Sequence, residues 1–314
     1  MSKVIRIGTR GSALAMKQTE MIMGLMKQQQ PGVNFEVVEI VTHGDRFRDK
    51  AITEMGEQVD KGIFNTALEE AVLEDRVDLA TCSFKDVESD LPPGLVAVSV
   101  GERERVNDVL VSRHEGGLNG LPRGAVLATS SPRRTSQLKA FREDLSFVPL
   151  RGNVTTRVEK ESLNYDGVVL AAAGLLRLGL QDHIREFVDE SVLLPAPAQG
   201  AMGCQYLESR PEIAGLVGAI QHADTELCVK AEKSVLVALS GGCFAPIGVL
   251  ARVVEGRFVL RCKVVSLDAA RQVDYQAQGQ PDEAESVIAE VVEGVRQQGG
   301  AEIIADTREA LRLG

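Results

Sequence analysis

The sequence predicts an α/β protein with two doubly wound lobes and a small C-terminal α+β domain that has an antiparallel sheet. Short apolar runs alternate with helical patterns through the first two-thirds of the chain, and the same alternation begins again near residue 125. After about residue 220, a long helical pattern is followed by closely spaced strand-like runs with short turns. With 314 residues, the chain is long enough for two or three domains that each have a core.

The first lobe begins with an apolar run that ends in a Gly-Ser turn. The helical pattern that follows is closed by Pro31-Gly32, because proline cannot continue a helix. Strands are expected at residues 4–9, 35–42, 77–83, 94–100 and 108–112, and helices at residues 12–30 and 64–75. The last two strands lead into the second lobe.

The second lobe repeats this alternation. Strands are expected at residues 125–129, 147–150 and 167–172, and helices at residues 132–141 and 154–162. Strands that alternate with helices predict a parallel sheet with helices on both faces.

The C-terminal domain has a different pattern. Helices are expected at residues 224–239 and 284–298, and strands at residues 249–254, 257–267 and 272–278. The short turns between these strands, such as Glu255-Gly256, predict an antiparallel sheet.

Two joints connect the lobes, at residues 101–107 and 194–200. The predicted domains are residues 1–101 with 197–219 for lobe 1, residues 102–196 for lobe 2, and residues 220–314 for the C-terminal domain. The composition of residues 195–200 favours a linker over a site.

Composition excludes several classes of function. The chain has 45 acidic and 35 basic residues, a net charge of −10, no tryptophan and only 4% aromatic residues. This balance opposes binding to nucleic acid or to an anionic membrane. The apolar stretch at residues 167–176 is too short to cross a bilayer, and residues 1–7 enter a strand at once, without a signal sequence. We therefore expect a cytoplasmic protein.

Cysteine and histidine spacing gives no metal-binding pattern. Five cysteines form no C-x-x-C pair, and four histidines are widely spaced. We expect reduced thiols and no metal site.

Arginines gather at the turns between strands and helices. Arg10 follows the first strand, with Ser12 at the predicted cap of the next helix. Arg133 and Arg134 stand in the first turn of the helix that begins at Pro132, where the helix dipole disfavours cations. An anion bound at the exposed helix amides would explain this pair.

A third turn supplies two more arginines, Arg151 and Arg157. Ligands of doubly wound sheets lie beyond the carboxyl ends of the strands. We therefore expect the arginines of these turns to line one cleft between the lobes, where the planar guanidinium group binds a carboxylate or phosphate bidentately. The alternative is that each arginine pairs with a surface Glu or Asp.

Another strand end carries Lys85 and Asp86. Lys85 is a candidate for the same anion site, and Asp86 should stay ionised among cations, where it can face a developing positive charge. A simple surface ion pair between these two residues is the alternative. Residues 45–62 are polar and glycine-punctuated, which fits a mobile lid or a plain solvated loop.

Cys243 lies in a Gly-Gly-Cys loop beside an apolar segment. Gly241 and Gly242 permit backbone angles closed to other residues, so the loop can present the thiol to a ligand. A buried cysteine in a tight turn is the alternative. A presented thiol together with scattered guanidinium groups indicates covalent handling of a small polyanion.

These residues fall in motifs that resemble those of the porphobilinogen deaminase (hydroxymethylbilane synthase) family over essentially the whole chain. The motifs occur in the family's order: Gly8-Thr-Arg-Gly-Ser12, Thr42-His-Gly-Asp45, Lys61-Gly-Ile-Phe64, Ser83-Phe-Lys-Asp86, Thr129-Ser-Ser-Pro-Arg-Arg134, Leu150-Arg-Gly-Asn-Val154, Ala173-Gly-Leu-Leu-Arg-Leu-Gly179, residues 195–201 and Gly241-Gly-Cys-Phe-Ala-Pro-Ile-Gly248. The resemblance implies two lobes like those of periplasmic binding proteins and a third domain that carries Cys243.

The resemblance also implies roles for single residues. Cys243 would carry a dipyrromethane cofactor through a thioether, and Asp86 would be the catalytic carboxylate. The implied cofactor-binding positions are Ser12, Lys85, Asp86, Ser131, Arg133, Arg134, Arg151, Gly152 and Arg157. The implied substrate-binding positions are Arg10, Ser12, Phe64, Arg151, Arg157, Arg177 and Gln199.

The implied reaction belongs to haem and other tetrapyrrole biosynthesis. Four porphobilinogen molecules are condensed head to tail on the cofactor, each with loss of ammonia, and water releases hydroxymethylbilane. The resemblance and the acidic surface together favour a monomer.

Departures from the family pattern motivate an alternative function. Cys82 stands where the family usually has histidine, and Glu57, Val59 and Asp60 differ from the usual residues of the lid. A non-catalytic two-lobe protein that binds a carboxylate-rich ligand is therefore the main alternative. A thiol transferase that uses Cys243 with a histidine base is disfavoured, because no histidine is near Cys243 in the sequence.

Overall fold

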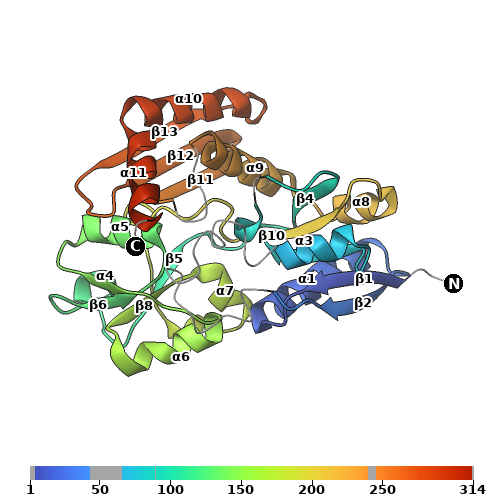
Figure 1. The fold of residues 1–314 in the computed structure, drawn as a ribbon, viewed down its shortest axis with the longest axis horizontal. Helices are drawn as coiled ribbons and strands as arrows, with labels where there is room; N and C mark the ends of the chain where they lie inside the picture. Colours follow the sequence, from blue (N-terminus) through green and yellow to red (C-terminus); the bar gives the residue numbers. More distant parts are fainter. Residues whose placement is uncertain (1–3, 43–65, 89, 240–244, 313–314) are drawn as a thin grey trace. The chain divides into compact units, whose positions relative to one another are not determined.

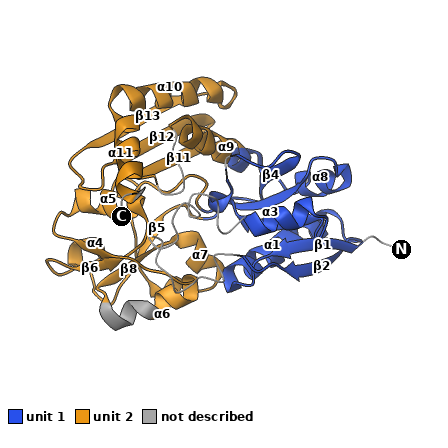
Figure 2. Ribbon diagram, in the orientation of Figure 1, with its two compact units in different colours: residues 1–104, 200–226 blue, residues 105–199, 227–314 orange. Residues whose placement is uncertain are grey.

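The computed structural model describes residues 4–42, 66–88, 90–239 and 245–312. The chain forms two compact units, shown in Figure 2: unit 1 has residues 1–104 and 200–226, and unit 2 has residues 105–199 and 227–314. Two of the three junctions, after residues 104 and 199, lie inside the joints expected from the sequence, and the third follows residue 226. The C-terminal residues share unit 2 with the second lobe, and the division into three domains stays a prediction.

Unit 1 is built on a five-stranded sheet with the order β2-β1-β3-β10-β4. Its strands are β1 (Val4–Thr9), β2 (Asn34–Glu39), β3 (Leu79–Ser83), β4 (Leu95–Val100) and β10 (Met202–Leu207). Strands β1, β2 and β3 pair in parallel, whereas β10 is antiparallel to both β3 and β4.

Helices cover both faces of this sheet (Figure 1). Helices α1 (Ala13–Gln29) and α8 (Pro211–Gly218) share a core with one face, to which Cys204 of β10 belongs. The next residue of β10, Gln205, points to the opposite face because side chains alternate along a strand. There its amide donates to Glu69 of α3 (Thr66–Leu73) over 3.0 Å, so α3 covers that face.

The second lobe, in unit 2, has the same sheet plan, with the order β7-β6-β8-β5-β9. Its strands are β5 (Asp108–Val111), β6 (Val126–Ala128), β7 (Ser146–Val148), β8 (Gly167–Ala171) and β9 (Ile184–Phe187). Here β5 is the antiparallel strand between β8 and β9. Helices α4 (Gly117–Gly120) and α5 (Pro132–Phe141) pack on one face, and α6 (Val154–Asn164) and α7 (Ala172–Arg177) pack on the other.

The rest of unit 2 is a three-stranded antiparallel sheet of β11 (Ile247–Val254), β12 (Arg257–Val265) and β13 (Gln272–Gly279). Helices α9 (Ala223–Ala238), α10 (Ala284–Gln297) and α11 (Gly300–Arg312) share its core, in which Phe258 is fully buried. The small sheet is joined to the second lobe by hydrogen bonds from the Val249 amide to the Pro195 carbonyl and from Lys263 Nζ to the Ser191 carbonyl, both 3.0 Å long. The described residues also form the short 3₁₀ turns η3 (Phe84–Asp86), η4 (Gln181–His183) and η5 (Pro281–Glu283).

This architecture confirms the predicted α/β class, with two doubly wound sheets and a small antiparallel sheet. The prediction that each sheet is parallel was wrong for one strand of each, β10 and β5. In both cases the chain arrives from the other unit, because β10 follows β9 in sequence and β5 follows β4. No crossover helix precedes these two strands, and a crossover is what a parallel neighbour requires.

Several elements were not predicted at all. They are β9, β10, α4, α7, α8 and α11. The C-terminal prediction stopped at Gly299-Gly300, where Gly299 has a φ of 85°, a value that favours glycine. This residue ends one helix, and α11 begins directly after it.

Candidate functional site

In unit 1, four of the predicted site residues follow the carboxyl ends of neighbouring strands. Arg10 and Ser12 come directly after β1, and Lys85 and Asp86 lie in η3 directly after β3. Strands β1 and β3 are paired in parallel, so these ends meet at the same edge of the sheet. The structure therefore places the four residues at the edge that the sequence predicted.

Ser12 and its neighbours form a tight turn into α1. Ser12 caps this helix, because its hydroxyl accepts a hydrogen bond from the Ala15 amide over 3.3 Å. A Cβ atom at Gly11 would lie only 1.9 Å from Oε1 of Glu39. A side chain at position 11 would therefore displace the exposed carboxylate of Glu39.

The turn that carries Asp86 is held in place by the two residues before Lys85. Phe84 is buried and its amide donates to the Ala201 carbonyl over 3.0 Å, while Ser83 exchanges hydrogen bonds with the Gln18 amide group. Lys85 and Asp86 are half-buried in the same turn. The backbone of the predicted catalytic carboxylate is thus fixed by a buried ring and by a strand of the sheet.

In unit 2, predicted residues follow the ends of β6, β7 and β8. Ser131 caps α5, and Arg151 and Gly152 precede α6, which contains Arg157. Arg177 ends α7, which directly follows β8. These strands are paired in parallel, so the residues share one edge of the second sheet.

One serine joins the turns after β6 and β7. Ser130 donates to the Leu150 carbonyl over 2.9 Å and accepts from the Leu150 amide over 3.0 Å. In the next turn, Gly152 has a φ of 121°, and its carbonyl accepts a hydrogen bond from Arg157 Nε over 2.7 Å. The Arg157 side chain is therefore directed back toward the turn that also carries Arg151.

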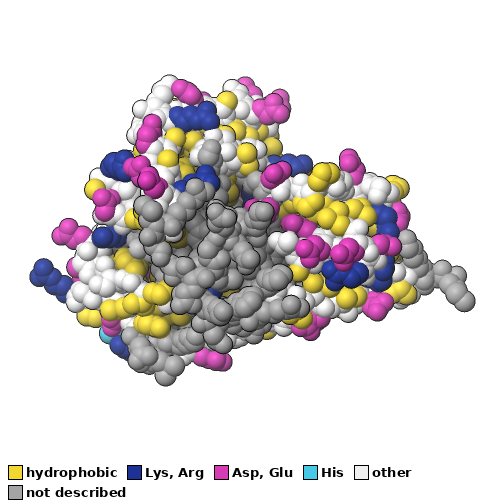
Figure 3. Space-filling view, viewed as in Figure 1, with side chains coloured by type: hydrophobic (Ala, Val, Ile, Leu, Met, Phe, Trp, Pro, Cys, Tyr) yellow, Lys and Arg dark blue, Asp and Glu magenta, His cyan; other side chains and the backbone are white. Residues whose placement is uncertain are grey.

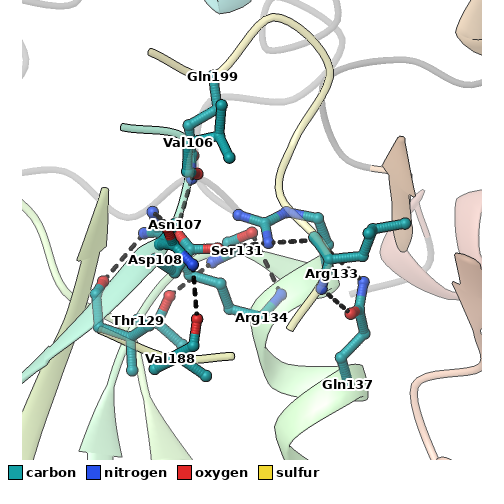
Figure 4. A network of polar contacts seen from close by, with 12 residues as sticks. Val106, Asn107, Asp108, Thr129, Ser131, Arg133, Arg134, Gln137, Val188 and Gln199 are labelled. Carbon is teal, nitrogen blue, oxygen red and sulfur yellow. Dashed lines mark hydrogen bonds and ion pairs between the residues drawn. The ribbon is translucent and has the colours of Figure 1, made fainter. Parts of the chain in front are cut away.

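Arg133 and Arg134 have a different environment from the one we predicted. Both are buried, and both bind the buried carboxylate of Asp108 at the start of β5, as Figure 4 shows. Burial would raise the pKa of Asp108, but the charges of the two guanidinium groups hold it well below its usual range. The protein itself, through Asp108, thus supplies part of the negative charge that the arginine pair at the start of α5 needs. Their assignment to the cofactor stays a prediction.

Gln199 belongs to the same cluster. Its amide nitrogen donates to the Val106 carbonyl over 2.8 Å and to Oδ1 of Asp108 over 3.1 Å. Residues 194–199 are therefore well bonded, although their composition favoured a simple linker. The Leu194 amide donates to Gln137 over 2.7 Å, and the Ala198 amide donates to Glu232 over 2.6 Å.

Asp108 is the functional candidate that sequence reasoning missed. An acidic residue at the entrance of a fully buried Val-Leu-Val strand requires a cationic partner, and this signal was present in the sequence. Phe64, Cys243 and the lid segment at residues 45–62, with Glu57, Val59 and Asp60, lie outside the described residues.

Within the described parts of the chain, no helix is both long and apolar enough to span a membrane. The same residues contain no group of three His, Cys, Asp or Glu side chains placed to hold a metal ion.

Comparison with known proteins identifies the family. The model of the dipyrromethane cofactor-binding domain of porphobilinogen deaminase matches residues 5–215, and the model of the C-terminal domain of the same enzyme matches residues 226–296. This chain belongs to the porphobilinogen deaminase family. The predicted family and the predicted cofactor are confirmed by these matches.

Individual relatives are similar to this porphobilinogen deaminase family member over nearly its full length. The porphobilinogen deaminase of Desulforudis audaxviator is 41% identical over 309 residues, which cover 98% of this chain and 99% of the relative. The porphobilinogen deaminase of Syntrophomonas wolfei is 38% identical over 306 residues, which cover 97% and 99%. A solved nutrient-binding protein from Burkholderia cenocepacia bound to methionine has a TM-score of 0.44 at 14% identity, covering 68% of this chain and 90% of that one.

Proposed function

We propose that this protein is a hydroxymethylbilane synthase, a transferase of haem and other tetrapyrrole biosynthesis. It joins four porphobilinogen molecules head to tail on a covalent dipyrromethane, with loss of ammonia at each addition, and then releases hydroxymethylbilane. The observation that carries this proposal is the match of the cofactor-binding domain model across residues 5–215.

The chemistry of the predicted binding residues fits this cofactor. Each pyrrole ring bears an acetate and a propionate, so a two-ring cofactor has four carboxylates to neutralise and two N–H groups to satisfy. Lys85, Arg151 and Arg157 supply cationic donors at the strand ends, and Asp86 supplies an acceptor for N–H groups. When bound, the cofactor supplies the pyrrole carbon that is extended.

Asp86 is the proposed catalytic carboxylate. Loss of ammonia from the aminomethylpyrrole of porphobilinogen leaves a cationic ring, and a fixed carboxylate beside its N–H stabilises that charge. A preorganised charge of this kind lowers the barrier by several kcal/mol. The same oxygen atoms can accept and return a proton.

Cys243 is the proposed attachment point. The other four cysteines, at positions 82, 204, 228 and 262, are buried. Burial raises the pKa of Cys204 to about 12 and also raises that of Cys262, so the reactive thiolate is disfavoured at both positions. This supports the assignment of the covalent bond to the remaining thiol.

We also propose that the enzyme is cytoplasmic and monomeric, with no nucleic-acid or membrane partner. The net charge of −10 supports this proposal. Acidic and basic side chains are interspersed on the coloured part of the face in Figure 3, and no continuous basic surface is visible there.

Intact-mass measurement tests the proposed function. Denatured wild type from cells that make porphobilinogen should carry a covalent increment of two pyrrole units, and Cys243→Ser should lack it. Cys228→Ser, which makes the same change at a buried thiol of α9, should keep it. Loaded wild type should release ammonia from porphobilinogen, and Asp86→Ala should lose about a hundredfold or more of this rate with an unchanged circular dichroism spectrum.

The alternative function gives a different result. A wild type of unmodified mass that binds porphobilinogen and releases no ammonia would indicate a non-catalytic binding protein. Full turnover by cofactor-loaded Asp86→Ala would show that Asp86 is not the catalytic carboxylate. The assignment of the reaction itself would still stand.

A further inference from the structure

We propose that Asp108 is a positioning residue for the ligand-binding cluster of unit 2, and that it fixes Arg133 to receive a carboxylate of the cofactor. The inference rests on the proposed function. Asp108 itself contacts no ligand in this proposal and acts through its protein partners.

The contacts of Asp108 single it out. Its Oδ2 accepts from Arg133 Nη1 over 2.6 Å. Its Oδ1 accepts from Arg134 Nε over 2.9 Å, from Arg134 Nη2 over 2.6 Å and from the Gln199 amide over 3.1 Å. One carboxylate therefore binds three residues that were predicted, independently of it, to contact cofactor or substrate (Figure 4).

Arg133 and Arg134 differ in how many of their guanidinium nitrogens already donate to protein acceptors. All three side-chain nitrogens of Arg134 are used, since Nη1 donates to the Val169 carbonyl over 2.9 Å. The hydrogen bonds of Arg133 leave from Nη1 alone, to Asp108 and to the Leu194 carbonyl over 2.9 Å. Nε and Nη2 of Arg133 are thus the guanidinium nitrogens of this pair that remain for a further acceptor.

The charge of the cluster favours such an acceptor. Asp108 is 0% exposed, Arg133 4% and Arg134 7%, so two positive charges and one negative charge are buried together, a net of +1. A buried charge without a counterion is costly, and one further carboxylate would neutralise the cluster. Both arginines stand in the first turn of α5, whose N-terminal amides also favour an anion.

The fold explains why Asp108 can do this. It is the first residue of β5, the antiparallel strand that lies between β8 and β9. Because β5 runs against its neighbours, its first residue lies at the carboxyl edge of the parallel strands, where α5 begins. The carboxylate of Asp108 is thereby placed next to the arginine pair, although Asp108 belongs to a different element of the chain.

Asp108→Asn tests the proposal, with cofactor loading as the readout. The variant keeps the shape of the side chain and removes its charge, so Arg133 loses its orienting partner. We expect the fraction of chains with the two-pyrrole increment to fall about tenfold or more, measured by intact mass on protein that circular dichroism shows to be folded.

Asp166→Asn is the matched control. Asp166 lies in the same unit and accepts from the Val126 amide over 2.8 Å and from His114 over 2.9 Å, with Arg113 at 3.4 Å, but binds none of the predicted site residues. Asp166→Asn should lower the unfolding midpoint, because a structural carboxylate loses its charge. Its cofactor loading should stay complete. Equal loading of Asp108→Asn and wild type overturns the proposal.

A second variant covers the case in which Asp108→Asn does not fold. Asp108→Asn combined with Arg134→Gln keeps the net charge of +1 and keeps Arg133. We expect this pair to fold and to load poorly, because Arg133 is no longer held, and full loading overturns the proposal. A crystal structure of wild-type holoenzyme adds an independent criterion, since Arg133 should bind both Asp108 and a cofactor carboxylate. Absence of that second contact also overturns it.

These outcomes are distinct from failure of the proposed function. If the enzyme assignment is wrong, wild type and the Asp166→Asn control both lack the increment. If only the role of Asp108 is wrong, wild type carries the increment and so does Asp108→Asn.

Discussion

Single buried carboxylates organise much of each unit. Asp78, the residue before β3, accepts hydrogen bonds from the Arg6 amide over 2.7 Å and from Arg6 Nε over 3.2 Å, and it also binds Arg210. It thereby ties two strands of unit 1 to the start of α8. Burial alone would raise the pKa of Asp78, but the hydrogen bonds from Arg6 and Arg210 lower it to about 2.

Asp78→Asn should therefore destabilise the protein in a pH-dependent way. The pKa is lower in the folded state than in the unfolded state, so the stabilisation is complete above about pH 4 and is lost as the pH falls toward 2. We expect wild type to exceed the variant by about 2.5 kcal/mol at pH 7. The measurement is urea unfolding at pH 7, 4 and 3.

The gap between the two proteins should narrow as the pH falls. Glu36→Gln, an exposed change in β2, should stay within about 0.5 kcal/mol of wild type throughout. A gap for Asp78→Asn that stays constant down to pH 3 would contradict the assigned pKa.

The sequence was sufficient for some site residues and insufficient for others. Arg10, Ser12, Lys85 and Asp86 follow apolar runs whose carboxyl ends can be read directly, so their common edge could be predicted. The partnership of Asp108 with the arginine pair could not, because it depends on β5 being inserted antiparallel between two strands that come later in the chain.

At the scale of elements, most strand positions were predictable, whereas the antiparallel directions of β5 and β10 were not. Helix α5 was predicted with its observed bounds, since Ser131, Pro132 and a periodic pattern all mark it. Strand β10 was not predicted, and its pairing with β3 supports the turn that carries Asp86. Hydrophobic periodicity identifies a strand but contains no information on its neighbours.

Gly203→Ala should disturb this support. A Cβ atom at Gly203 would lie 2.4 Å from Cδ2 of Phe84, the buried ring that anchors η3. We expect a loss of about 1–3 kcal/mol in stability, and kcat/KM reduced about tenfold or more as Asp86 moves. The assay is ammonia release from porphobilinogen by cofactor-loaded enzyme.

Gly215→Ala serves as its control. No atom lies within 4 Å of a Cβ built at this position in α8, so alanine should stabilise the helix by about 0.5–1 kcal/mol and leave turnover unchanged. Wild-type kinetics in Gly203→Ala would show that the Phe84 contact does not position Asp86.

At the scale of the whole molecule, the segment 194–199 joins the second lobe to the C-terminal sheet within unit 2. Glu232 of α9 accepts from the Ala198 amide over 2.6 Å and from the Ala251 amide of β11 over 2.8 Å. The Gln137 side chain of α5 donates to the Leu194 carbonyl and accepts from the Leu194 amide. Composition could not reveal this, because Pro, Ala and Gln are typical of linkers and the partners are distant in sequence.

Gln137→Met should loosen this segment. The change keeps the volume and leaves the buried Leu194 amide without its acceptor, at a cost of about 1–3 kcal/mol. We expect hydrogen exchange of the Leu194 amide to accelerate about tenfold, while the amides of β12 keep their rates. Gln297→Met, at an exposed position of α10, should leave the exchange rates of both the Leu194 amide and the β12 amides unchanged. An unchanged exchange rate at Leu194 in Gln137→Met would mean that the hydrogen bonds of Gln137 do not hold this segment.

The first two of the three crossings of the chain between the units, after residues 104 and 199, set an order of assembly during translation. In the described residues, β4 pairs with β10 alone, so residues 95–100 wait without a partner until residues 202–207 leave the ribosome. The strands of the second sheet are contiguous, from residue 108 to residue 187, and can close earlier. The nascent first sheet thus has an open edge while about a hundred residues are synthesised, which is the interval in which a chaperone would be most useful.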